Sequence, residues 1–393
     1  MPGDPFSGLF VPEALAEATS SKAWLAAMLE VEAALAEAEA EAGLIKAEVA
    51  EAIGSACDPD GFDADRLSRE GAKSANPVVP LVEALREKVG GDAAKFVHYG
   101  ATSQDVLDSA AMVVARRALV WIRGELDGVA ATCAELAERH RETPIAGRTL
   151  LQQALPTTFG LKVAGWLDSV LAARERLGTV SLAVQLGGPA GTLASLGPEG
   201  ARVVGLLAKR LDLEEPALPW HTARVRVADL GAALALTAGA VEKIALDVLL
   251  LSQTEIGEVA EPSGGGRGGS SSMPHKQNPV GSVIAIACAR RIRGDAGVLL
   301  AAMPQEHERA AGAWQSEWAP LNDALALTGG AAAAMRDALQ GLEVRPERMR
   351  ENLELLRAEL SGEEIDRALD AAGDLGSAGV FVDRALSRYR EGS

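Results

Sequence analysis

The chain has 393 residues, 48% of them hydrophobic and 4% aromatic, and its formal net charge is −17. This acidity disfavours a nucleic-acid-binding protein, because such proteins present a basic face and no Lys/Arg cluster stands out here. No uncharged run is long and apolar enough to span a bilayer, and residues 1–10 lack the basic segment and apolar core of a signal peptide. We therefore expect a soluble, cytoplasmic protein that contacts neither nucleic acid nor a membrane.

The three cysteines, Cys57, Cys133 and Cys288, are isolated in alanine-rich surroundings, and none forms a CxxC pair. A disulfide framework or a zinc site would need such paired spacing. We expect three buried structural thiols in a reducing compartment and no metal site.

Alanine and leucine supply most of the apolar residues, which is typical of an almost wholly helical protein. The first clear helix is predicted over residues 20–43, where Trp24, Met28 and Leu35 recur at helical spacing between a serine start and a glycine end. Shorter helices are expected at residues 47–56, 63–73 and 81–88. We assign residues 1–97 to an N-terminal helical domain.

Longer helical patterns follow over residues 105–140, 159–177, 201–211 and 227–251, after Pro279, and again up to about residue 340. The longest is an apolar seam in steps of three and four residues, formed by Val227, Leu230, Leu234, Thr237, Val241, Ile244, Val248 and Leu251. Because one chain offers few partner helices for this seam, we expect chains to associate through it.

These patterns place a central domain of long helices at residues 98–343. Arg345-Pro346 then breaks the chain, and residues 344–393 are predicted to form a short C-terminal helical domain. Its small core is expected from Met349, Leu353, Leu356, Ile365 and Phe381.

Residues 263–282, SGGGRGGSSSMPHKQNPVGS, combine a glycine-rich run with a dense polar cluster and are called the signature block below. A Gly/Ser run alone is most often a linker. Here it leads through Ser270, Ser271, His275, Lys276 and Asn278 into a helix that is predicted to begin after Pro279. Groups that transfer protons and bind anions, placed at a helix N-terminus, predict a site for a negatively charged ligand.

Within this block, GSSSMPHKQNP resembles the GSSxMPxKxNP signature of the fumarase/aspartase superfamily. Residues 100–108, GATSQDVLD (the TSQD block), resemble the GxTSxDxxD block of the same superfamily, although Thr102 or Ser103 would otherwise be interpreted as a helix N-cap. Residues 147–153, GRTLLQQ (the GRT block), are similar to the GRTHxQ block of adenylosuccinate lyases. In this chain Leu150 stands in place of the histidine.

The resemblance implies an all-α, three-domain, cofactor-free enzyme with a long central helical bundle, assembled as a homotetramer whose sites each draw on three chains. It gives Ser270 the transfer of a carbon-bound proton. Lys276, Asn278 and the N–H groups that open the following helix would hold the carboxylate that becomes an enolate. The other candidate substrate-binding residues are Thr102, Ser103, Arg148, Thr149, Gln152, Gln153, His98, Arg224, Ser271, His275 and Arg309. The alternative for Gln152 and Gln153 is a place on a helix surface.

The missing histidine favours one branch of the superfamily. A leaving amine or hydroxide needs a proton from a general acid, whereas a leaving carboxylate does not, because the pKa of its conjugate acid is about 4. Segments such as LPWHTAR and AAMPQEHER also resemble bacterial 3-carboxy-cis,cis-muconate cycloisomerases. This resemblance implies interconversion of 3-carboxy-cis,cis-muconate and 4-carboxymuconolactone in aromatic degradation. Two alternatives are a fumarate-forming C–N or C–O lyase of the same superfamily and a catalytically silent structural homologue.

Overall fold

The computed structural model describes residues 6–263, 267–269, 272–273, 276–355 and 375–392. This part of the chain is mostly helical, as predicted, and none of its helices is long and apolar enough to cross a membrane. It divides into two compact units, each drawn from three segments. Unit one comprises Met1–Trp121, Val180–Ala232 and Gly294–Ala326, and unit two comprises Ile122–Thr179, Ala233–Arg293 and Leu327–Ser393.

The helices fall into three groups by the unit in which they lie. Unit one contains α1 (Ser7–Phe10), α2 (Glu13–Ala18), α3 (Ser21–Glu41), α4 (Ala47–Ala56), α5 (Ala64–Gly71), α6 (Val78–Val89) and α9 (Gly200–Leu211). Unit two contains α8 (Phe159–Gly178), α13 (Pro346–Glu354) and α15 (Ala378–Glu391). Four longer helices contribute residues to both units: α7 (Ser103–Arg139), α10 (Val225–Leu251), α11 (Val280–Ala301) and α12 (Ala313–Gln340).

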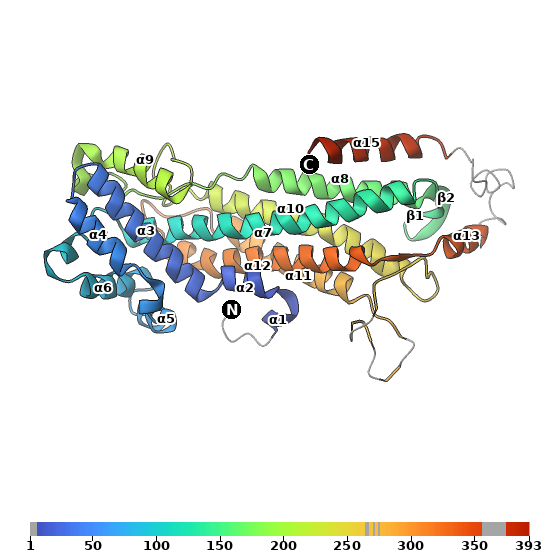
Figure 1. Ribbon diagram of the computed structural model, residues 1–393, viewed down its shortest axis with the longest axis horizontal. Helices are drawn as coiled ribbons and strands as arrows, with labels where there is room; N and C mark the ends of the chain where they lie inside the picture. Colours follow the sequence, from blue (N-terminus) through green and yellow to red (C-terminus); the bar gives the residue numbers. More distant parts are fainter. Residues whose placement is uncertain (1–5, 264–266, 270–271, 274–275, 356–374, 393) are drawn as a thin grey trace. The chain divides into compact units, whose positions relative to one another are not determined.

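Unit one is organised around α3, which packs against α4 and α9 (Figure 1). The helix begins where the sequence predicts it, because the Ser20 side chain accepts a hydrogen bond from the Ala23 N–H at 3.2 Å and so satisfies a free N–H of the first turn. Its apolar stripe, which includes Leu25, Leu29 and Leu35, is buried. The predicted helix over residues 20–43 is therefore confirmed.

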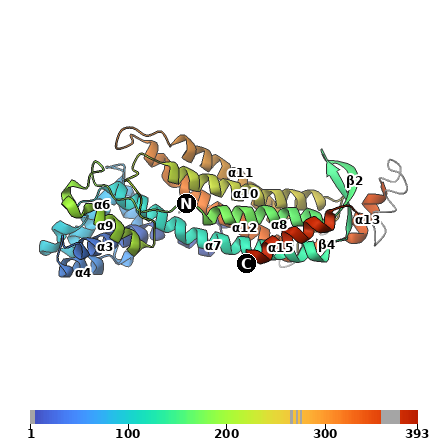
Figure 2. The ribbon, with the colours of Figure 1, turned by 90° about the horizontal axis from the view of Figure 1, so that it is seen from above.

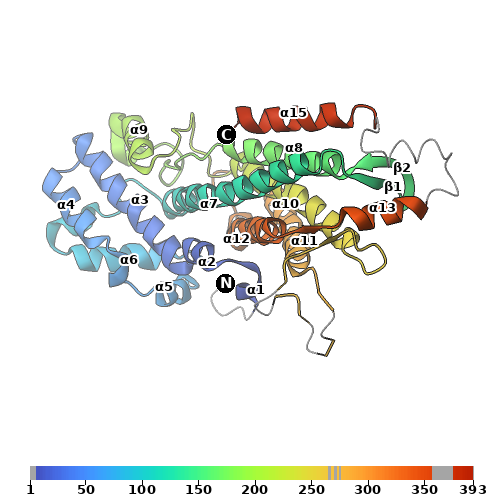
Figure 3. The ribbon, with the colours of Figure 1, turned by 45° about the vertical axis from the view of Figure 1, so that its right-hand side comes forward.

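Unit two is a set of helical segments joined by partly buried polar contacts. The Trp166 indole N–H of α8 donates to Asp247 of α10 at 2.7 Å, and Arg336 of α12 pairs with Glu125 of α7 at 2.6 Å. Helix α15 lies along α8 (Figure 2), and α13 packs against strand β1 (Pro144–Thr149; Figure 3). The two described helices that follow residue 344, α13 and α15, therefore pack with this unit.

Short strands form two antiparallel pairs in the described part of unit two. Strand β1 pairs with β2 (Gln152–Thr158), and β3 (Val259–Ala260) pairs with β4 (Glu343–Val344). Neither pair of strands is predicted from the sequence. The domain boundaries at residues 97 and 343 remain a prediction, because the two compact units are each built from segments that lie far apart in the chain.

The apolar seam of α10 is buried within a single chain. Its eight predicted positions are at most 4% exposed: Val227, Leu230, Leu234, Thr237, Val241, Ile244, Val248 and Leu251. The expectation that chains associate through this seam is therefore wrong, because the chain itself supplies the partner helices. The side of α10 that remains exposed carries Leu236 and Leu246 instead, which are 62% and 38% exposed.

Two further details differ from the sequence predictions. Cys133 and Cys288 are buried free thiols, but Cys57 is only partly buried. In the C-terminal segment Met349 and Leu353 are buried as expected, whereas Phe381 is 48% exposed because α15 buries its neighbour Val382 instead. Leu356 and Ile365 lie outside the described residues.

Candidate functional site

The TSQD block opens helix α7 in unit one. The carboxylate of Asp105 accepts a hydrogen bond from the Thr102 N–H at 2.9 Å, which fixes the first turn. Both Thr102 and Ser103 are partly exposed, and neither hydroxyl is hydrogen-bonded to another described residue. Two preoriented hydroxyls therefore remain available to a ligand.

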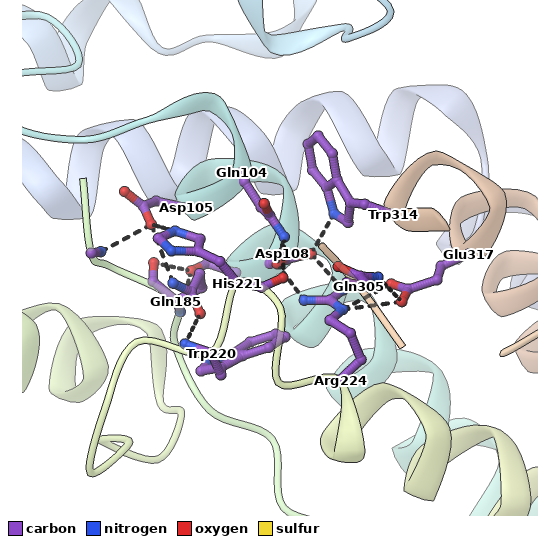
Figure 4. A network of polar contacts seen from close by, with 12 residues as sticks. Gln104, Asp105, Asp108, Gln185, Trp220, His221, Arg224, Gln305, Trp314 and Glu317 are labelled. Atoms are coloured by element: carbon purple, nitrogen blue, oxygen red, sulfur yellow. Dashed lines mark hydrogen bonds and ion pairs between the residues drawn. The ribbon is translucent and has the colours of Figure 1, made fainter. Parts of the chain in front are cut away.

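Asp105 joins this turn to a glycine-rich connection. Its carboxylate also accepts from the N–H groups of Gly187 at 3.0 Å and Gly188 at 2.9 Å, and from His221 Nε2 at 2.6 Å (Figure 4). Gly188 has φ +69°, and a Cβ there would lie 2.8 Å from the Gly100 carbonyl oxygen, so only glycine fits. Asp105 thus holds the backbone around Thr102 in place.

Arg224 belongs to the same buried network and not to a ligand-binding surface. It donates to both oxygens of Asp108 at 2.7 and 3.0 Å and to Glu317 at 2.5 Å, and it is 2% exposed (Figure 4). Burial alone lowers the pKa of Arg224, but the two carboxylates raise it further than burial lowers it. Both terminal nitrogens of Arg224 already bind carboxylates, so a role in substrate binding would require it to give up one of these pairs.

His98 is also engaged within unit one. Its Nδ1 lies 2.6 Å from Glu32 Oε1, and its backbone adopts a left-handed conformation with φ 62°. Burial opposes protonation, yet the charge of Glu32 and the hydrogen bond raise the pKa of His98 overall. The contact with Glu32 therefore holds His98 and the chain just before the TSQD block.

Arg309 differs from Arg224 in its partners. It donates to Gln104 Oε1 at 2.9 Å, to the Gly188 carbonyl at 3.1 Å and to the Pro189 carbonyl at 2.8 Å. All three acceptors are neutral, so its positive charge is not cancelled by a bonded carboxylate among the described residues. This makes Arg309 the stronger candidate for binding an anion beside the TSQD block.

The GRT block forms the tip of a β-hairpin in unit two. Thr149 pairs with Gln152, which leaves Leu150 and Leu151 as a two-residue turn with φ 50° and 65°. Such turns normally use Asn-Gly, so the sequence gives no turn signal here and the hairpin was missed. Both leucines are highly exposed, at 96% and 73%, and Thr149 and Gln152 are exposed beside them. The helix-surface alternative for Gln152 and Gln153 is therefore wrong.

Arg148 does not carry a free charge on this hairpin. Its two terminal nitrogens donate to Glu258 at 2.7 and 2.9 Å, and Glu258 is fully buried. A direct contact between Arg148 and a substrate carboxylate would have to compete with this pair. Gln153 pairs with Arg148 across the strands, and its buried Oε1 has no hydrogen-bond donor among the described residues.

The signature block is described only in part. Ser270, Ser271 and His275 lie outside the described residues, whereas Lys276 is exposed. The Asn278 side chain and backbone N–H both donate to the Gly268 carbonyl, at 3.1 and 2.8 Å. Gly268 has φ +72°, and a Cβ there would lie 2.8 Å from the Asn278 carbonyl oxygen, so this turn requires glycine.

The N-terminus of α11 is already occupied by a carboxylate. Glu261 accepts hydrogen bonds from the N–H groups of Gly281 and Ser282, each at 2.8 Å. In this structure the N–H groups of Gly281 and Ser282, which the sequence predicts to bind the substrate's charge, bind Glu261 instead. Neither Glu258 nor Glu261 is among the residues predicted from the sequence. The segment QTEIGEVAEP nevertheless carries acidic residues among apolar ones, a pattern that indicates buried and therefore paired carboxylates.

The three blocks are divided between the two units of the chain. The TSQD block lies in unit one, and the GRT and signature blocks lie in unit two. Among the described residues no group of three or more His, Cys, Asp or Glu side chains is arranged to hold a metal ion. The candidate groups are hydroxyls, amides and cations, which suit binding of a polycarboxylate.

Comparisons with known proteins show the family to which the chain belongs. A family model described as a lyase matches residues 11–294. The chain therefore belongs to this family of lyases, within the fumarase/aspartase superfamily.

Among individual relatives, the 3-carboxy-cis,cis-muconate cycloisomerase of Pseudomonas aeruginosa is 40% identical over 98% of this chain and 96% of its own length. The nitrosuccinate lyase of Streptomyces davaonensis is 45% identical over 94% of this chain and 80% of its own. The crystal structure of the 3-carboxy-cis,cis-muconate lactonizing enzyme of Pseudomonas putida superimposes with a TM-score of 0.91 and 37% identity. That match covers 99% of this chain and all of the other.

Proposed function

We propose that this chain is a 3-carboxy-cis,cis-muconate cycloisomerase that interconverts 3-carboxy-cis,cis-muconate and 4-carboxymuconolactone. The observation that carries the proposal is the similarity, over 98% of the chain, to a relative of that name, together with a signature block that retains Lys276 and Asn278. This similarity also disfavours a catalytically silent homologue.

In the lactone-opening direction, Ser270 removes the proton on the carbon next to a carboxylate. The electron pair moves into that carboxylate to give an enolate, and the ring carboxylate then leaves with the C–O bonding electrons. Lys276 and Asn278 stabilise the enolate charge, while Thr102, Ser103, Arg309 and the exposed Thr149 and Gln152 are proposed to bind the other carboxylates. Cyclisation follows the same steps in reverse, with Ser270 returning the proton to carbon.

Leu150 supports this reaction class, because a leaving carboxylate needs no proton at neutral pH. The same reasoning supports a second candidate, elimination from nitrosuccinate. Nitrite is likewise a stable anion when it leaves, and the relative named for this substrate is 45% identical to the chain. An adenylosuccinate-type elimination, which expels an amine, is disfavoured by the same leucine.

We propose that the protein acts as a cytoplasmic, three-domain homotetramer whose sites combine residues from three chains. Three observations support shared sites. The GRT block lies on an exposed hairpin tip, the TSQD block lies in the other unit, and α10 and α11 expose apolar side chains such as Leu236 and Val283. An apolar helix surface of this kind is typical of an interface between subunits.

The test is an ultraviolet assay with purified protein and synthetic 3-carboxymuconate, run beside nitrosuccinate, adenylosuccinate and argininosuccinate. Lactonisation removes the conjugated diene and lowers absorbance, whereas fumarate formation raises short-wavelength absorbance, and nitrite is measured separately by a colour reaction. Turnover of nitrosuccinate alone would select the second candidate. No change with any substrate would contradict both.

Ser270→Ala is the matched variant for the chemical step. It should abolish turnover while the oligomeric mass stays that of the wild type, because alanine removes only the hydroxyl. Ser272→Ala, two residues further on and exposed, serves as the control. Activity retained in Ser270→Ala would overturn the assignment of Ser270.

A further inference from the structure

Residues Glu258–Glu261 connect two of the three blocks within unit two. Their centre is strand β3, whose Val259 pairs with Val344 of β4. Their two ends carry carboxylates that are almost fully removed from solvent, with Glu258 0% and Glu261 8% exposed. Burying a carboxylate lowers the stability of a protein unless the group is paired and hydrogen-bonded. The contacts of these two residues therefore indicate what each of them holds in place.

Glu258 holds the hairpin. Its carboxylate accepts hydrogen bonds from both terminal nitrogens of Arg148 on β1, at 2.7 and 2.9 Å, and from the side-chain amide of Asn352 at 2.8 Å. Arg148 immediately precedes Thr149 at the hairpin tip. A two-point guanidinium–carboxylate pair restricts orientation as well as distance, so Glu258 fixes the direction in which the GRT block projects.

Glu261 holds the end of the signature block. Its carboxylate accepts the N–H groups of Gly281 and Ser282, each at 2.8 Å, and the Ser282 hydroxyl at 2.7 Å. A Cβ on Gly281 would lie 2.8 Å from Ala338 Cβ and 3.1 Å from Glu261 Oε2, so the glycine permits this close approach. Asn278 lies only three residues before Gly281, which makes Glu261 an anchor for the cationic end of the block.

We propose that Glu258 and Glu261 are positioning residues for the reaction, which hold the GRT block and the signature block in register from the two ends of strand β3. The inference rests on the proposed function, because those blocks supply the reacting groups. Neither carboxylate touches the substrate. Since Glu261 occupies the N-terminus of α11, the enolate charge is left to Lys276 and Asn278, whose placement then depends on Glu261.

The experiment compares Glu261→Gln, Glu258→Gln and Ser282→Ala with Glu343→Gln. Glu343 is an exposed residue of β4 whose backbone pairs with Ala260, and among the described residues its side chain bonds only Arg345, at 2.9 and 3.0 Å. Glu261→Gln should lower kcat about 10- to 100-fold with little change in KM, since small displacements of reacting groups reduce rates on that scale. Glu343→Gln should behave as the wild type. Glu261→Gln combined with Ser282→Ala should be no worse than Glu261→Gln alone, because both remove the same contact.

A second measurement separates positioning from loss of folding and from failure of the proposed function. The nitronate form of 3-nitropropionate copies the charge of an enolate, and its binding is measured by calorimetry on variants whose circular dichroism and oligomeric mass match the wild type. Glu261→Gln should weaken nitronate binding about tenfold and succinate binding much less. If the wild type turned over none of the four substrates, this comparison would still test the anchor. Wild-type kcat and nitronate affinity in Glu261→Gln would overturn the inference.

Discussion

Arg224 binds Asp108 through both terminal nitrogens, with Nη1 2.7 Å from Oδ2 and Nη2 3.0 Å from Oδ1, inside a region that solvent does not reach. The Trp314 indole N–H donates to the same carboxylate at 3.0 Å, and Glu317 binds the other side of the guanidinium. Four residues, one from α7, two from α12 and one from the turn before α10, are thereby joined at the end of the TSQD block (Figure 4). All four residues are buried, so we expect the network to stabilise the fold around the TSQD block.

Arg224→Met should therefore destabilise the protein before it affects substrate binding. Removing the cation leaves Asp108 and Glu317 buried without a paired positive charge, which typically costs about 3–5 kcal/mol. Denaturant unfolding followed by circular dichroism measures the loss. A variant with wild-type stability and a raised KM would show instead that Arg224 binds the substrate.

Arg309→Met should show the opposite behaviour, with a raised KM and little change in stability, because the hydrogen bonds of Arg309 go only to neutral acceptors.

The turn of the hairpin stores strain at two exposed leucines. Left-handed backbone costs a residue with a side chain about 1 kcal/mol, and Leu150 and Leu151 both adopt it. Replacing them together by Asn and Gly should raise the unfolding free energy by about 1 kcal/mol and should lower kcat/KM, because strain of this kind persists where function requires it. Thermal unfolding and the ultraviolet assay measure the two effects. A variant that is both more stable and equally active would show that the leucine pair has no functional role.

Much of the fold could be predicted because a helix is encoded by local sequence signals. The serine before α3 and the apolar spacing within it were visible in the sequence, and the structure confirms them. The hairpin was missed because its turn uses leucines at positions where Asn-Gly is the usual signal. Burial of the α10 seam within one chain could not be predicted either, because periodicity shows that a helix face is buried but not which chain covers it.

Less of the candidate site than of the fold could be predicted from the sequence. The sequence identified the blocks but could not reveal which of their charges are already paired. Arg148 and Arg224 look like free cations in sequence, yet carboxylates that lie 110 and 93 residues further along the chain bind them. Long-range pairing of this kind leaves no trace in local spacing. Arg309, which the sequence ranked no higher, keeps an uncancelled charge because its acceptors are backbone and amide oxygens.

Glu39 on α3 should make the stability of the protein depend on pH. Its side chain is fully buried, neither oxygen has a hydrogen-bond partner among the described residues, and burial followed by the charge of Glu32 raises its pKa to about 9. A carboxyl group whose pKa is higher in the folded state stabilises fully below its unfolded pKa, and that contribution is lost as pH rises towards 9. Glu39→Gln should thus match the wild type near pH 4 and exceed its unfolding free energy by about 3 kcal/mol at pH 7.

Urea unfolding at both pH values measures this difference, and Glu48→Gln on the exposed side of α4 is the control for removing one negative charge. Equal stability of Glu39→Gln and the wild type at pH 7 would mean that the buried carboxyl group finds a compensating partner in solution.

The exposed side of α10 should be the surface through which chains associate. Leu236 is 62% exposed in the single chain, and Leu246 lies further along the same helix at 38%. Leu236→Arg places a charge on this surface, and burying an unpaired charge in an interface costs several kcal/mol. In light scattering the variant should therefore have a lower mass than the wild-type oligomer. It should also lose activity, because the GRT and TSQD blocks of different chains separate.

Leu218→Arg, at a residue that is 75% exposed in the connection between α9 and α10, should retain both the oligomeric mass and the activity of the wild type. An intact, active oligomer of Leu236→Arg would place the interface on another surface and would remove the main support for sites shared between chains.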